Sequence, residues 1–236
     1  MKLLIIFALL LAACSVCPAE KVLFAGFDAS GTALEAGSNP YAKAWSELLD
    51  KMHGGEHVFA SIINEKGLAN GAPVIDVATR SFNLLFDHRS AYDQAVKQKL
   101  ALQKDKLNAI LRAAPPSHGT EIIGFLFQAA KILEAYPSSR RQIVIYTDGI
   151  QEGFDVNLAR MRLTDAEFSK TIKAEQLASR MPSLKGISVW FVTGPSMRNQ
   201  INTNMLLRME EFWKKFMQAA GGDLRSFAPI LANYDE

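Results

Sequence analysis

The clearest candidates for chemistry are the oxygen-bearing side chains that follow the apolar run Val22–Phe27. Asp28, Ser30 and Thr32 occupy alternate positions in the segment Asp28-Ala29-Ser30-Gly31-Thr32. A carboxylate with two hydroxyls is a set of hard oxygen donors, which suits Mg²⁺ or Ca²⁺ better than softer metals. The same residue types are common in turns, where Asp and Ser bond to the nearby backbone. The segment is therefore a candidate cation site, with turn formation as the competing interpretation.

Two later stretches carry groups of the same kind. Thr120 follows a glycine and precedes an apolar helical segment, and Thr147-Asp148-Gly149 follows an apolar run. Asp28, Thr120 and Asp148 lie far apart in the sequence, so they can form one site only if the fold brings them to the same place. Whether they meet depends on the order of the strands and helices that carry them.

Short apolar runs bounded by turn residues predict six strands. Segments with apolar residues at helical spacing lie between most of them. The predicted strands are Lys21–Phe27, His57–Ile63, Pro73–Ala78, Gln142–Tyr146, Ile187–Val192 and Leu224–Phe227. The predicted helices run from Ser38 or Asn39 to Gly54, from about Ser90 to Ala113, from Ile122 to Tyr136, from Thr164 to about Arg180, and from Asn202 or Thr203 to Gly221.

This alternation predicts an α/β, Rossmann-like doubly wound, mostly parallel sheet of order 3-2-1-4-5-6, with helices on both faces. The link between the second and third strands is too short for a parallel crossover, so the third strand should be an antiparallel edge strand. In this order the first and fourth strands are neighbours where the strand order reverses, which is where such sheets bind ligands. Asp28 and Asp148 should face each other there, with Ser30, Thr32 and Thr120 nearby.

This combination of segments resembles the metal-ion-dependent adhesion site of von Willebrand factor A domains. The pattern of that family is D-x-S-G-S, then a Thr before a later helix, then T-D-G, and the resemblance extends from about Lys21 to Phe227. It implies that Ser30 and Thr32 bind the cation directly, that Thr120 and Asp148 bind it directly or through water, and that Asp28 holds the hydroxyls and a bound water.

The resemblance also implies a function. The cofactor would be Mg²⁺, with Ca²⁺ or Mn²⁺ as alternatives, and one open coordination position would accept an acidic side chain from a protein partner. The protein would then be a non-catalytic binding module. Thr32 departs from the family pattern, which has Ser there, and its methyl group crowds the site and restricts χ1.

Two other functions remain open from the sequence. The first segment also resembles that of haloacid-dehalogenase-type phosphatases, in which Asp28 would be the nucleophile. However, Ser30 stands where most of these enzymes have a second, acid–base Asp, and serine does not exchange a proton near neutral pH. The other alternative is an A-like scaffold that binds no metal and docks through its helical faces.

The amino terminus resembles a bacterial lipoprotein signal. Residues 1–13 have one lysine and a short apolar run, which predicts a signal peptide rather than a membrane span. Leu11-Ala12-Ala13-Cys14 looks like a lipobox, which implies cleavage before Cys14 and lipidation of its thiol. The expected organisation is a lipidated tether at 14–20, an A-like domain at 21–228 and a tail at 229–236. The expected location is the cell envelope, on the periplasmic face of the outer membrane.

Composition limits the other classes of function. The chain has 236 residues, 49% of them hydrophobic, which is enough for one sizeable core. Its formal net charge of +2 gives no argument for binding nucleic acid. The match of His53-Gly54-Gly55-Glu56-His57 to an H-x-x-E-H zinc pattern is attributed to chance, because the pattern requires a helix and the glycines end one.

Overall fold

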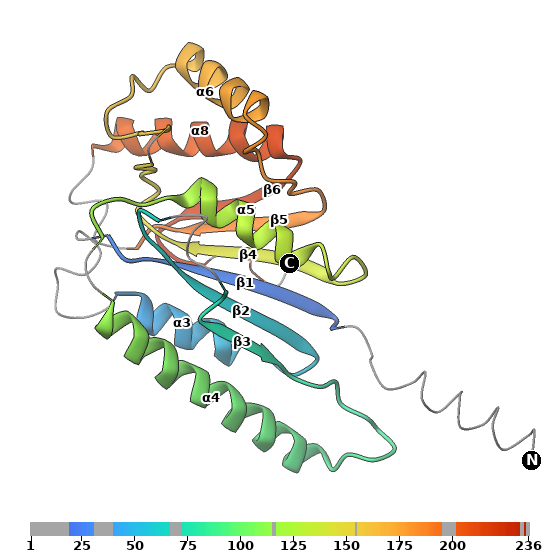
Figure 1. Ribbon diagram of the computed structural model, residues 1–236. Helices are drawn as coiled ribbons and strands as arrows, with labels where there is room; N and C mark the ends of the chain where they lie inside the picture. The colour runs from blue at the N-terminus through green and yellow to red at the C-terminus, as the bar shows by residue number, and fades with distance from the viewer. Residues whose placement is uncertain are drawn as a thin grey trace, which may run out of the picture.

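The computed structural model describes residues 19–30, 40–66, 72–114, 117–153, 155–194, 202–231 and 234. Strands and helices alternate along these ranges, as Figure 1 shows. The described elements are β1 (Lys21–Asp28), α3 (Pro40–Asp50), β2 (Glu56–Ile63), β3 (Ile75–Ala78), α4 (Arg89–Ala113), α5 (Ile122–Leu133), β4 (Arg140–Tyr146), α6 (Asp165–Leu177), β5 (Ile187–Val192), α8 (Thr203–Ala220) and β6 (Asp223–Ala228).

The strands form one six-stranded sheet in the order β3-β2-β1-β4-β5-β6. β3 pairs with β2 in the antiparallel direction, and the other neighbouring pairs are parallel. The predicted fold class, strand order and antiparallel edge strand are therefore confirmed. Since β1 and β4 are neighbours, their carboxyl ends meet at the same edge of the sheet.

Helices cover both faces of the sheet and form two hydrophobic cores. On one face α5 and α8 pack against alternate residues of the strands, with Phe24 and Ile145 among the buried strand residues, and α6 packs on α8. On the other face α3 and α4 cover the opposite set, which includes Phe27 and Tyr146. Because β1 is covered on both sides, it is buried from Val22 to Asp28, which explains its continuous apolar sequence.

Three helices end earlier than the sequence pattern predicts. α3 ends at Asp50 instead of Gly54, because the amides of Lys51 and Met52 donate to carbonyls three residues earlier in tighter turns. α5 ends at Leu133 instead of Tyr136, because the amide of Tyr136 donates to the carbonyl of Leu133 and the last turn is tighter than an α-helix. α6 ends at Leu177 instead of about Arg180, because Ser179 has a positive φ of 56°. Capping signals were more reliable: Thr164 accepts the amide of Glu167 at the start of α6, as its spacing predicts.

Several predictions at the chain's amino terminus lie outside the described residues, including the signal peptide, Cys14 and most of the tether. Thr32 also lies outside them. At the other end, Tyr234 belongs to the segment predicted as a tail, yet its side chain is buried and its ring contacts that of Trp190. Among the helices that the structure describes, none is both long and apolar enough to cross a bilayer.

Gly26 allows the closest packing between β1 and α5. A methyl group built on Gly26 would lie 2.6 Å from the ring of Phe125 and 2.8 Å from Cδ1 of Ile63. We predict that Gly26→Ala lowers the free energy of unfolding by about 1–3 kcal/mol through overpacking, as measured by urea denaturation. Combining it with Phe125→Leu should cost less than the sum of the two single changes. Strictly additive costs would contradict this explanation.

Candidate functional site

Asp28 is the centre of a hydrogen-bond network at the carboxyl end of β1. Its side chain is fully buried, and both carboxylate oxygens accept hydrogen bonds. Oδ1 accepts from the backbone N–H of Ser30 at 2.8 Å and from the hydroxyl of Thr120 at 3.1 Å. Oδ2 accepts from the hydroxyl of Thr147 at 2.7 Å. The carboxylate therefore ties together three segments that are remote in sequence.

Backbone hydrogen bonds hold these segments in register beyond the ends of the strands. The amide of Ala29 donates to the carbonyl of Ile63 in β2, and the amide of Ser117 donates to the carbonyl of Ala29. The carbonyl of Thr120 accepts from the amide of Glu152. The segment that carries Thr120 is thus fixed between β1 and the loop after β4, so its hydroxyl is placed by backbone contacts.

Asp148 lies just beyond the end of β4, in a turn that hydrogen bonds also hold in place. Its Oδ1 accepts the amide of Ile150 at 2.8 Å. Gly149 has a φ of +79°, which favours glycine, and its carbonyl accepts from the indole N–H of Trp213 at 2.9 Å. A methyl group built on Gly149 would lie 2.9 Å from the ring of Phe227. These contacts explain why a glycine follows the aspartate.

Burial raises the pKa values of both carboxylates at this edge. Burial raises the pKa of Asp148 to about 7, and the negative charge of Asp28 adds to this effect. Burial also raises the pKa of Asp28, although its hydrogen bonds from Thr147, Ser30 and Thr120 oppose the shift. The phenol of Tyr41 has a raised pKa through its own burial and the charges of both aspartates. Two acidic groups and a tyrosine therefore share one poorly solvated region.

The donor set at this edge fits a hard divalent cation. A hydroxyl that donates its hydrogen to Asp28 keeps its oxygen lone pairs for another contact, so Asp28 can orient the Thr120 and Ser30 oxygens as ligands. Asp148 keeps a second carboxylate oxygen in addition to the one that bonds to Ile150. A cation would also neutralise the repulsion between the two carboxylates, which the pKa of Asp148 reveals.

Four of the five predicted site residues lie at one edge of the sheet: Asp28, Ser30, Thr120 and Asp148. The fifth, Thr32, is not among the residues that the structure describes. Thr147 is a direct partner of Asp28 that the sequence pattern did not predict, although its position beside Asp148 at a strand end was a usable signal. The pattern also did not predict Tyr41, which reads from sequence as an ordinary apolar helix residue.

His57 and Asp155 are engaged in side-chain contacts away from this site. His57 contacts Asp76 through Nε2 at 2.6 Å and the hydroxyl of Tyr136 through Nδ1 at 2.9 Å. Both of its ring nitrogens therefore have hydrogen-bond partners. Asp155 forms an ion pair with Arg180 at 2.9 Å. Across the described ranges no three His, Cys, Asp or Glu side chains converge as a metal-binding group, so a cation at the β1–β4 edge would need hydroxyl ligands.

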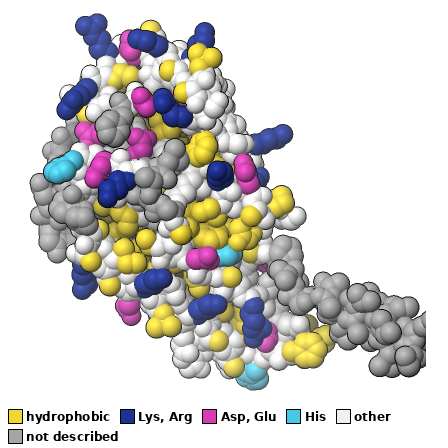
Figure 2. Space-filling model, viewed as in Figure 1, with side chains coloured by type: hydrophobic (Ala, Val, Ile, Leu, Met, Phe, Trp, Pro, Cys, Tyr) yellow, Lys and Arg dark blue, Asp and Glu magenta, His cyan; other side chains and the backbone are white. Residues whose placement is uncertain are grey.

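The distribution of charged side chains on the face in Figure 2 is consistent with the net charge of +2. On the face in Figure 2, Lys and Arg side chains lie interspersed with Asp and Glu and with hydrophobic atoms, without a broad basic region. This distribution gives no electrostatic support for binding nucleic acid.

The sheet order, the antiparallel β3, and the placement of the Asp28 and Asp148 segments at the point where the order reverses decide the fold class. The chain has a von Willebrand factor A-like fold. No known family profile matches the sequence of this A-like domain, and no curated protein matches it either.

Solved structures similar to the A-like domain have low sequence identity. A von Willebrand factor type A protein from Catenulispora acidiphila is 16% identical, with 86% of this chain and 43% of that chain covered and a TM-score of 0.39. An aerotolerance-related membrane protein from Bacteroides fragilis is 16% identical, with coverages of 90% and 92% and a TM-score of 0.43. Manganese-loaded TRAP from Plasmodium vivax is 15% identical, with coverages of 81% and 64% and a TM-score of 0.41.

The raised pKa of Asp148 predicts a pH-dependent stability in metal-free buffer. The carboxyl group titrates near 7 in the folded state and near 3.9 in an unfolded chain, so the folded state binds the proton more tightly. The stability that this proton contributes is complete below about pH 4 and is lost as the pH rises to about 7. We expect a loss on the order of 1–3 kcal/mol, measured by denaturation with EDTA present.

The control for this prediction is an aspartate on the surface. Asp148→Asn should flatten the profile between pH 4 and 7, whereas Asp105→Asn, at an exposed position of α4, should leave it unchanged. An identical slope in native protein and Asp148→Asn would show that the Asp28–Asp148 interaction is not the cause.

Proposed function

We propose that this protein is a non-catalytic, membrane-anchored binding module whose A-like domain binds a protein partner through Mg²⁺. The cation would be held by Ser30, Thr120 and Asp148, with Asp28 orienting the hydroxyls and Thr32 as a further ligand. An acidic side chain of the partner would occupy the remaining coordination position. When bound, the cation supplies the positive charge that attracts this carboxylate.

The observation that carries the proposal is the fully buried Asp28, which accepts the Thr120 hydroxyl, together with a partly buried Asp148 whose pKa the charge of Asp28 helps to raise. Two carboxylates in a poorly solvated region destabilise the fold when both are ionised, unless a cation or proton compensates them. Networks built only for turn formation do not require the second acidic group. The arrangement is therefore better explained by a cation than by local structure alone.

The same geometry argues against a phosphatase. The substrate of a nucleophilic aspartate must be able to reach its carboxylate. Asp28 is fully buried, and each of its carboxylate oxygens already accepts a hydrogen bond from a threonine hydroxyl. Ser30 lies where an acid–base group would be needed, and its backbone amide bonds to Asp28. Among the described residues, Asp28 is therefore inaccessible as a nucleophile, and the position two residues after it holds no acid–base group.

The membrane anchor is proposed from Cys14 and its preceding apolar segment. Lipidation at this cysteine would leave the described domain, which starts at Ala19, on a short tether. We further propose that the anchored domain lies on the periplasmic face of the outer membrane. Several acyl chains on one cysteine would hold the protein stably, where a single chain would not.

Titration calorimetry of the detergent-solubilised full chain with MgCl₂ tests the cation. We predict that native protein binds Mg²⁺ and that Asp148→Ala weakens binding by about tenfold or more, because a carboxylate ligand is lost. Asp105→Ala should bind as the native protein does. Equal binding isotherms for native protein and Asp148→Ala would remove the metal site from the proposal.

Crosslinked capture from native cell envelopes tests the partner. Capture should be lost both with EDTA and with Asp148→Ala, and it should return when Mg²⁺ is restored to the native protein. Equal capture of the partner with and without EDTA would instead favour a metal-free scaffold that docks through its helices.

A phosphatase assay tests the non-catalytic part of the proposal. With p-nitrophenyl phosphate and MgCl₂, we expect native protein and Asp28→Asn to release phosphate at the same background rate, because Asp28 is not accessible. Release by the native protein that disappears in Asp28→Asn would establish an enzyme instead.

A further inference from the structure

Three consecutive apolar side chains protrude from the connection between β3 and α4. Leu84, Leu85 and Phe86 are 84%, 83% and 84% exposed, which is unusual for adjacent large hydrophobic residues. Nothing among the described residues covers them. They are also remote from the carboxylates at the β1–β4 edge, so the binding site proposed above does not explain them.

The protruding residues are presented by an ordered turn. Asn83 accepts the amide of Leu85 through its side chain and the amides of Phe86 and Asp87 through its carbonyl. The carboxylate of Asp87 in turn accepts the amide of Asn83 and forms a two-pronged ion pair with the guanidinium of Arg80. The exposed apolar residues are therefore held outward by the backbone around them.

This turn lies at the amino edge of the sheet, opposite the candidate cation site. The parallel strands all begin at this edge, where Lys21 pairs with Glu56 and with Arg140. β3 runs the other way, so its last residue, Ala78, pairs with His57 near the start of β2. The connection that follows Ala78 therefore projects from the same edge, as Figure 1 shows.

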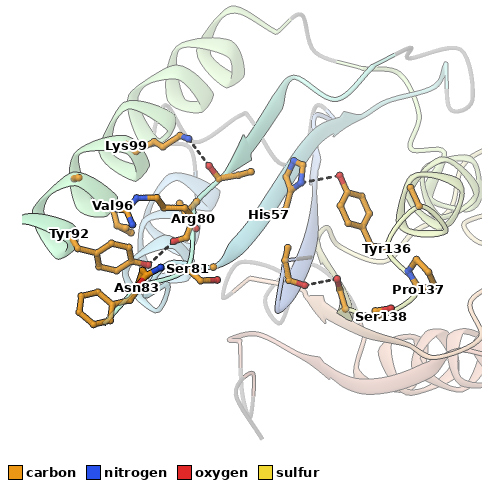
Figure 3. Close-up of a pocket in the computed structure, with 18 residues that line it drawn as sticks. His57, Arg80, Ser81, Asn83, Tyr92, Val96, Lys99, Tyr136, Pro137 and Ser138 are labelled. Carbon is orange, nitrogen blue, oxygen red and sulfur yellow. Dashed lines mark hydrogen bonds between the residues drawn. The ribbon is translucent and has the colours of Figure 1, made fainter. Parts of the chain in front are cut away.

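The chain enters the domain beside this turn. The amide of Glu20 donates to the carbonyl of Gly55, whose own amide donates to the carbonyl of Arg80. Ala19 and Asn83 both line a groove of about 1040 Å³ between the β3–α4 connection and the segment around Tyr136. Figure 3 shows the two sides of this groove. Any anchor before Ala19 must therefore lie close to the protruding side chains.

Basic side chains lie at the same edge. Arg140 and Arg141 open β4 and Lys185 precedes β5, and the guanidinium of Arg141 donates to the carbonyl of Lys185 at 2.8 Å. Arg140 and Lys185 are exposed. They lie three and four strands from β3 along the same edge, which also carries the exposed acids Glu20 and Asp223. On an anionic lipid surface, the protruding apolar groups would enter the interface and these cations would meet the headgroups.

We propose that the amino edge of the domain lies on an anionic phospholipid bilayer, with Leu84, Leu85 and Phe86 inserted into its interface. This inference rests on the proposed anchor at Cys14, which is five residues before Ala19. Five residues reach at most about 17 Å, so the tether holds the amino edge near the lipid. The contact orients the domain, and the candidate cation site at the opposite edge faces away from the membrane.

A depth measurement on the full-length, lipidated chain tests this contact. An environment-sensitive fluorophore is attached to Leu85→Cys in a Cys17→Ser background, and the protein is reconstituted in vesicles of phosphatidylethanolamine and phosphatidylglycerol. We expect blue-shifted emission that nitroxide-labelled lipids quench. The matched control is Leu207→Cys, at an exposed leucine of α8. The C-terminal end of α8, Ala220, lies at the amino edge of the sheet, and Leu207 is 13 residues before it, which places it about 20 Å from that edge along the helix. The emission of this control should remain that of a label in water.

The possible outcomes separate this contact from the anchor. Lipid quenching at position 85 but not at position 207 supports the contact. A water-like label at position 85 on a protein that stays with the vesicles overturns the contact and leaves the anchor intact. A blue shift without lipid quenching also overturns it, because a second copy of the chain would then cover the turn.

If native protein and Cys14→Ser both fail to fractionate with membranes, the proposed anchor is wrong. The labelled Leu85→Cys chain is then mixed with the same vesicles without an anchor. Quenched, blue-shifted emission would still support the contact, and an unchanged spectrum would overturn it.

Discussion

The structure depends on two carboxylates being brought together in a region that water reaches poorly. Asp28 and Asp148 end neighbouring parallel strands, so the sheet itself enforces their proximity. Burial and the charge of Asp28 raise the pKa of Asp148 to about 7, so this arrangement is unfavourable when both carboxylates are ionised. A fold selected for stability alone would place a neutral residue at one of the two positions. The retained charge is therefore most simply understood as part of a binding site for a positive group.

The rest of the molecule supports that pair by fixing the backbone around it. The hydroxyls of Thr120 and Thr147 approach Asp28 from different elements, and the indole of Trp213 holds the turn after Asp148. Behind these contacts, the buried β1 is packed on both faces by separate hydrophobic cores. The side chains at the edge are thus attached to a strand that is packed on both faces, so the site would need little reorganisation to accept a ligand.

Strand order, strand direction and most of the candidate site could be predicted from the sequence, because apolar periodicity and link length have direct structural consequences. The short link before β3 determined its direction, and the residues after β1 and β4 had to meet once those strands were neighbours. Local endings were less predictable: Ser179 ends α6 through a positive φ that a serine does not signal. The roles of Thr147 and Tyr41 depend on side-chain packing across elements, which periodicity does not encode.

The two edges of the sheet have different chemistry. Asp28 and Asp148 lie with hydroxyls at the carboxyl edge, whereas the protruding apolar residues lie at the amino edge near the chain's entry. The central claim, that the carboxyl edge holds a cation, is tested most directly by anomalous diffraction from crystals grown with MnCl₂. We predict an anomalous peak in contact with Asp148 and with the Ser30 and Thr120 hydroxyls. A peak that is absent there at saturating Mn²⁺, in crystals that leave this edge open to solvent, would contradict the account.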